Sequence, residues 1–77
     1  MPPKNAQPLR DAVDFDAYDW LQSQAPHYII AIEQQLASGS TPLDIRIMLS
    51  RWLGPDRQGL ALRCEQAARH IQRAGGE

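Results

Sequence analysis

The chain has 77 residues, of which 43% are apolar and 22% charged, and its formal net charge is −1. These values are typical of one globular domain and exclude a chain that is disordered throughout. Cys64 is the only cysteine, which excludes an intramolecular disulfide and a zinc site built from several cysteines. We therefore expect a cytoplasmic protein, and the N-terminus lacks the apolar run of a signal peptide or membrane span.

Charge is distributed unevenly between the two halves of the chain. Residues 1–40 carry five acidic side chains against two basic ones, whereas residues 41–77 carry six arginines against four acidic side chains. Two interpretations are open. Either the halves attract each other, within one fold or across a dimer, or the arginines form a surface that binds a polyanion.

Residues 1–9 contain three prolines and no apolar periodicity, so we expect a flexible, disordered N-terminal arm before one helical domain over residues 10–75. The first helix is predicted to begin between Asp11 and Asp14 and to end near residue 24, because acidic side chains favour the first turns of a helix. Its apolar residues recur at three-residue steps, namely Phe15, Tyr18 and Leu21.

The junction between the second and third helices is the clearest local signal in the sequence. Gly39 can close a helix in the left-handed conformation without steric cost. Thr41 can cap the next helix, with Pro42 at its first position and Asp44 completing a capping box. The third helix is apolar on two sides, which is typical of the central helix of a bundle. The predicted helices span residues 26–38 and 42–53.

A fourth helix is predicted over residues 56–74. Gly54 and Pro55 end the preceding helix, and Asp56 can cap the new one. One side of the fourth helix is narrow and consists mostly of small residues: Leu60, Cys64, Ala67, Ala68, Ile71 and Ala74. The predicted fold class is all-α, a small bundle of three to four antiparallel-connected helices.

The apolar stripes of these helices predict a single hydrophobic core. Each stripe follows the helical period, so its members point to one side of their helix. The predicted core residues are Leu21, Tyr28, Ile32, Leu36, Ile45, Met48, Leu49, Trp52, Leu60, Cys64, Ala67 and Ile71.

Enzymatic function has little support in the sequence. His27, Cys64 and His70 are too widely spaced to supply the three or four ligands of a metal site. The acidic residues of the first helix are explained by the helix dipole, and no apolar neighbours are expected to desolvate them. We predict no catalytic residue, no metal, no cofactor and no small-molecule substrate, hence a protein that is not an enzyme.

Nucleic-acid binding is an alternative, because the third and fourth helices resemble a helix-turn-helix superficially. One side of the fourth helix carries residue types that contact bases and phosphates, namely Arg57, Arg63, Gln66, Arg69 and Arg73. Against this alternative, Leu62 on the same side of the helix has no polar group with which to contact base edges in the groove of a nucleic acid. The sequence pI near 6.0 also argues against a dedicated nucleic-acid module.

Several large apolar residues fall outside the predicted core stripes: Ile30, Leu43, Ile47 and Leu62. Single exposed apolar residues are ordinary, but several in so small a domain indicate a surface that another molecule covers. We therefore predict a small helical module, an adaptor or regulator, for protein–protein interaction or self-association. Its expected partner is another protein or a second copy of itself, and not a membrane.

Overall fold

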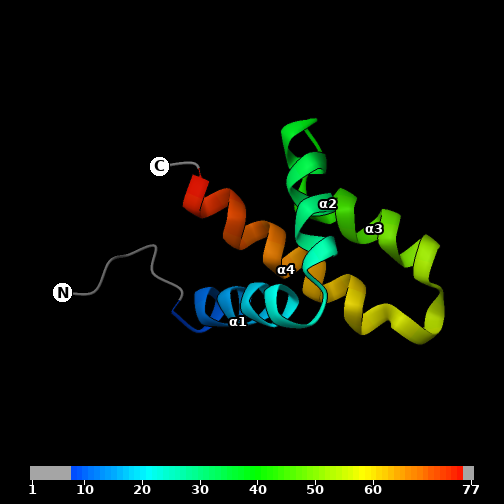
Figure 1. Ribbon diagram of the computed structural model, residues 1–77, viewed down its shortest axis with the longest axis horizontal. Helices are drawn as coiled ribbons and strands as arrows, with labels where there is room; N and C mark the ends of the chain where they lie inside the picture. Colours follow the sequence, from blue (N-terminus) through cyan, green and yellow to red (C-terminus); the bar gives the residue numbers. More distant parts are fainter. Residues whose placement is uncertain (1–7, 76–77) are drawn as a thin grey trace.

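The computed structural model describes residues 8–75, which form α-helices joined by short turns (Figure 1). The helices are α1 (Pro8–Gln24), α2 (Pro26–Ala37), α3 (Pro42–Leu53) and α4 (Gln58–Gly75), with a short 3₁₀ helix, η1 (Pro55–Arg57), before α4. No strand occurs between residues 8 and 75. The predicted small all-α bundle is confirmed.

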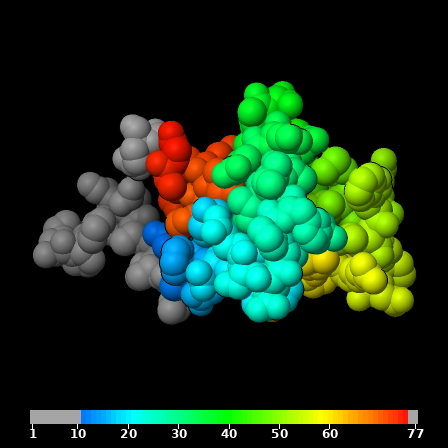
Figure 2. Space-filling view, viewed as in Figure 1, coloured from blue at the N-terminus to red at the C-terminus, as the bar shows by residue number. Residues whose placement is uncertain are grey.

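The central helix of the bundle is α4. It contacts each of the other α-helices, and most extensively α1 and α3. Figure 1 shows α1 and α3 near opposite ends of α4, with α2 crossing in front of its middle, and the space-filling view in Figure 2 shows α3 at the periphery. The expectation that the third helix would be central is therefore wrong. One side of α3 packs on α4, and its second apolar side, with Leu43 and Ile47, is exposed.

Helix α1 begins at Pro8, earlier than the predicted start between Asp11 and Asp14. Proline suits the first position of a helix, where its missing N–H would have no partner. The prediction of a flexible arm over residues 1–9 rests on three prolines and the lack of apolar periodicity, and it is wrong for Pro8 and Leu9, which lie in α1. The rest of that predicted arm, residues 1–7, lies outside the described residues, as do residues 76–77.

The predicted junction between α2 and α3 is confirmed. Thr41 Oγ1 accepts a hydrogen bond from the Asp44 amide, and Asp44 Oδ2 accepts one from the Thr41 amide, both at 3.1 Å. Gly39 has a φ of +98°, and its amide and the next one donate to carbonyls of the last turn of α2. These bonds close α2 at Ala37, one residue earlier than predicted, in the pattern of a Schellman motif.

The start of α4 differs from the prediction. Gly54, with a φ of +81°, ends α3, but Asp56 lies inside η1 and does not cap an α-helix. The α-helix begins at Gln58, whose side-chain amide donates to the Gly54 carbonyl at 2.8 Å and accepts from the Ser50 hydroxyl at 3.0 Å. Gln58 thus joins the end of α3 to the start of α4.

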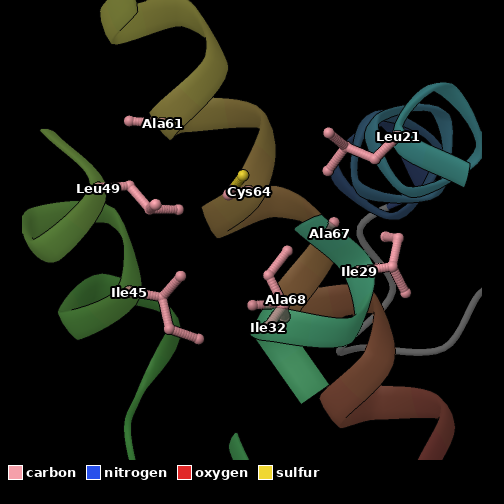
Figure 3. Close-up of a cluster of buried hydrophobic side chains, with 9 residues drawn as sticks. All are labelled: Leu21, Ile29, Ile32, Ile45, Leu49, Ala61, Cys64, Ala67 and Ala68. Carbon is pink, nitrogen blue, oxygen red and sulfur yellow. The ribbon is translucent and has the colours of Figure 1, made fainter. Parts of the chain in front are cut away.

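The core forms where the other helices meet the small-residue side of α4 (Figure 3). Among the predicted core residues, Tyr28, Leu36, Leu60 and Ile71 are partly buried against it. The predicted residues that are fully buried are Leu21, Ile32, Ile45, Leu49, Cys64 and Ala67. The prediction omitted Ala17, Ile29, Ala61 and Ala68, which are also buried.

Two predicted core residues, Met48 and Trp52, are exposed. Their exposed fractions are 37% and 83%. Both lie on the edge of α3 that faces α2, and these two helices diverge (Figure 1) and make fewer contacts than either makes with α4. The stripe of α3 that packs on α4 is therefore limited to Ile45 and Leu49, with Leu53 partly buried.

Burial raises the pKa of the Cys64 thiol to about 11. Since the thiolate is the nucleophile, the folded protein should resist iodoacetamide at neutral pH. Alkylation, followed by mass spectrometry, should become rapid only in urea concentrations that unfold the chain. Rapid alkylation without urea would mean that Cys64 is accessible and that α4 packs differently.

The raised pKa also predicts a loss of stability at alkaline pH. The neutral thiol stabilises the fold fully below the ordinary pKa of 9.0, and this contribution is lost as the pH rises toward 11. At about pH 10.5 the loss should be roughly 2 kcal/mol. Urea unfolding of the wild type and of Cys64→Ala at pH 7 and about pH 10.5 measures this loss. The variant lacks the thiol but keeps every other titratable group, so the difference between the two proteins isolates the contribution of Cys64.

Candidate interaction surface

One side of α3 points away from the core and carries large apolar side chains. We define the outer face of α3 as Leu43, Asp44, Ile47, Met48, Arg51 and Trp52, all of which are exposed. At about 100° per residue, Leu43, Ile47, Arg51 and Asp44 lie on the side of the helix away from Ile45 and Leu49. Met48 and Trp52 lie on the edge toward α2, and Trp52 is only about 20° from Ile45 around the helix. Trp52 is the most exposed large hydrophobic residue on this face.

A groove of about 330 Å³ lies between α2 and α3, beside the outer face. Met48 and Trp52 belong to both features, so the groove extends the outer face toward α2. On the α2 side, His27 packs against Tyr28 with their ring centroids 4.5 Å apart. The remaining lining residues are Ala31, Gln34, Gln35 and the buried Leu49.

The structure brings together only part of the predicted interaction residues. Leu43 and Ile47 lie on the outer face of α3, with exposed fractions of 53% and 48%. Ile30, exposed at 58%, lies on α2 and is not among the residues that line the groove. Leu62 lines a separate depression between α1 and α4, together with Val13 and Gln66. The four residues therefore do not form one patch.

Met48 and Trp52 were missed as surface residues because they continue the apolar stripe of α3. Trp52 follows Ile45 and Leu49 at helical spacing, so a single sequence favours burial for it. Whether that edge is covered depends on where α2 lies, and α2 is placed by its contacts with α4 and α1. The sequence held a signal only for Met48, which lies at one edge of the stripe, whereas Trp52 lies between Met48 and Ile45 around the helix.

Two arginines of the predicted nucleic-acid face, Arg69 and Arg73, bind carboxylates within the fold. The Asp14 side chain is buried, and its Oδ2 accepts a hydrogen bond from Arg73 at 3.1 Å and lies 3.5 Å from Arg69 Nε. The buried Glu65 binds Arg69 at 3.0 Å and Arg46 at 3.1 Å. The pairs with Asp14 confirm that the acidic first half and the arginine-rich second half attract each other within one fold.

The expectation that no apolar neighbours desolvate the acids of α1 is wrong for Asp14. Asp14 shares one side of α1 with the buried Ala17 and Leu21, at spacing i, i+3 and i+7, and this side packs on α4. The sequence contained that spacing. The partners Arg69 and Arg73 are too distant along the chain for local reasoning to identify them.

The other residues of the predicted nucleic-acid face are dispersed. The Arg63 guanidinium lies 4.3 Å from the centroid of the Trp20 ring, a cation–π contact between α4 and α1. Gln66 lines the depression between α1 and α4, and Arg57 is exposed in η1. Arg57 and Arg63 make no ion pair with residues 8–75, unlike Arg69 and Arg73.

Within residues 8–75, no group of three or more His, Cys, Asp and Glu side chains is placed to hold a metal ion. None of the helices in this range combines the length and hydropathy needed to cross a bilayer. Comparisons with protein-family models, with curated proteins and with solved structures found no match. The function is therefore argued from the geometry of the surface alone.

Proposed function

We propose that the protein is a non-catalytic association module that binds a protein partner through the outer face of α3. The observation that carries this proposal is Trp52, a tryptophan exposed at 83% beside the exposed Met48, one turn earlier on α3. Tryptophan and methionine are enriched at protein interfaces, and tryptophan is a frequent centre of binding energy. A folded domain this small gains nothing in stability from leaving such a group of side chains in water.

The adjoining groove supports a docking role more than a catalytic one. The side chains in its lining that carry strong polar groups are those of His27, Tyr28, Gln34 and Gln35. Neither buried carboxylate, Asp14 or Glu65, is among its lining residues. A partner's apolar side chain could occupy the groove while its polar groups meet the two glutamines at the rim. We expect this association to take place in the cytoplasm, where the single buried Cys64 would stay reduced.

The nucleic-acid alternative receives less support from the arrangement of the arginines. Binding to phosphate requires cations that are free to replace counterions. Arg69 and Arg73 instead contact the carboxylates of Asp14, Glu65 and Asp11. A phosphate would have to compete with these carboxylates at both positions.

Ile47→Asp should abolish association without unfolding the protein. Ile47 is half exposed, so an aspartate there leaves the core intact but places a charge in the middle of the proposed interface. Chemical cross-linking of the purified protein, alone and in extracts of its source cells, should yield a product with the wild type that the variant lacks.

Ile30→Asp is the matched control, because Ile30 is equally apolar and still more exposed but lies outside the outer face and the groove. Circular dichroism should show the same helix content for the wild type and both variants. A cross-linked product that survives Ile47→Asp, or that is lost with Ile30→Asp alone, would contradict the proposal.

A further inference from the structure

The outer face of α3 has the same chemical pattern in both directions along the helix. From its two ends inward, Leu43 corresponds to Trp52, Asp44 to Arg51, and Ile47 to Met48. The apolar positions thus correspond to apolar positions, and the acidic position corresponds to a basic one. The centre of this pattern lies between Ile47 and Met48. A surface with this property is complementary to itself when a second helix lies antiparallel to it.

Two-fold symmetry turns this pattern into a set of contacts. In a dimer with two-fold symmetry, every contact occurs twice. If a residue of the first copy touches a different residue of the second copy, the same two residues also touch with the copies interchanged. An axis through the centre of the pattern would place Ile47 of each copy near Met48 of the other, and Asp44 near Arg51, because these four positions lie within about 100° of one another around α3. Leu43 and Trp52 would flank this interface on opposite sides. The two Asp44–Arg51 pairs would lie about 11 Å apart along the helix, a length over which packed helices stay in contact.

The charges favour the antiparallel arrangement over the parallel one. An antiparallel pair would place Asp44 beside Arg51 of the other copy twice, whereas an in-register parallel pair would set like charges against each other. Among residues 8–75 Arg51 makes no ion pair, whereas Arg46, on the other edge of α3, binds Glu65. The capping bond to the Thr41 amide holds the Asp44 carboxylate in place and leaves the side chain exposed.

We infer that the partner is a second copy of this chain, and that the two copies pack their outer faces of α3 antiparallel around a two-fold axis. This inference rests on the proposed function and names its partner. Trp52 would then lie at the edge of this interface, beside the groove between α2 and α3.

A charge-exchange experiment tests the arrangement. Arg51→Asp alone should create two contacts between like charges in the dimer, and so should Asp44→Arg alone. Each variant should raise the dimer dissociation constant roughly 10- to 30-fold relative to the wild type. A mixture of the two variants should restore dimers, because both contacts across the axis are then between opposite charges. Sedimentation velocity at several concentrations measures each case.

A second pair of variants guards against loss of folding, since Asp44→Arg also removes the capping box. Ile47→Glu and Met48→Lys alter exposed residues at the centre of α3 and should meet across the axis. Each variant alone should be monomeric with an unchanged circular-dichroism spectrum, and the mixture should form a heterodimer. Mixtures that stay monomeric in both pairs, beside a dimeric wild type, would overturn the antiparallel arrangement.

The outcome also separates this inference from the proposed function. A wild type that stays monomeric at millimolar concentration overturns self-association, but a cross-linked product with another protein that Ile47→Asp removes would still support the outer face as a docking surface. A wild-type dimer that tolerates all four outer-face variants overturns the antiparallel arrangement. It overturns the proposed function as well if Ile47→Asp removes no cross-linked product with another protein.

Discussion

Leu49→Ala should lower the free energy of unfolding by about 2–5 kcal/mol, the usual range for truncating a buried leucine. Leu49 is 5% exposed and packs in the core beside Cys64 and Ala68 (Figure 3). A domain of this length has a total stability of roughly 4–11 kcal/mol, so the variant should be close to unfolding at room temperature. Urea unfolding followed by circular dichroism measures the change.

Met48→Ala is the matched control, since Met48 is the neighbouring residue but is 37% exposed. Its cost should stay under about 1 kcal/mol, as for most surface substitutions. If Met48→Ala cost as much as Leu49→Ala, α3 would be rotated about its axis relative to the structure. The outer face would then be buried in the monomer, and the proposed association surface would lose its basis.

Arg69→Ala combined with Arg73→Ala should destabilise the protein by about 3 kcal/mol. The double variant removes both cationic partners of the buried Asp14 carboxylate, whose Oδ1 already lacks a hydrogen-bond partner among the described residues. Breaking a buried ion pair typically costs 3–5 kcal/mol, and we expect the low end because truncating both arginines admits water to the carboxylate. Urea unfolding at neutral pH is the measurement.

Two further variants identify the cause of that loss. Arg57→Ala removes an exposed arginine that makes no ion pair with residues 8–75, so it should change stability by less than about 0.5 kcal/mol. Adding Asp14→Leu to the double variant should recover most of the stability, because an apolar side chain of similar size suits the site between Ala17 and α4. No recovery would mean that the loss does not come from Asp14 but from the buried Glu65, which also loses Arg69, or from the packing of the aliphatic stems of the arginines.

Features determined by neighbouring residues could be predicted from the sequence. The capping box at Thr41, the closure of α2 at Gly39 and the small-residue side of α4 all depend on residues within a few positions. For the same reason the third helix has the bounds that were predicted for it. Local chemistry therefore determined most of the secondary structure and part of the core.

Features that depend on the relative placement of helices could not be predicted. Trp52 and Leu49 both belong to the apolar stripe of α3, and only the position of α2 and α4 makes one exposed and the other buried. Asp14 was assigned to the helix dipole because its partner Arg73 lies 59 positions along the chain. The candidate surface thus emerged from two residues that local reasoning had placed in the core.

The central position of α4 has a consequence for how the chain folds during synthesis. The first three helices leave the ribosome before α4, yet each of them finds its main packing partner in α4. Until α4 emerges, Leu21, Ile32 and Ile45 have no small-residue surface to pack against. The most extensive contact, between α1 and α4, joins segments from opposite ends of the described residues. Bringing these segments together closes a long loop, so this contact costs more chain entropy than contacts between neighbouring helices. The first three helices therefore cannot bury their apolar stripes until α4 has been synthesised.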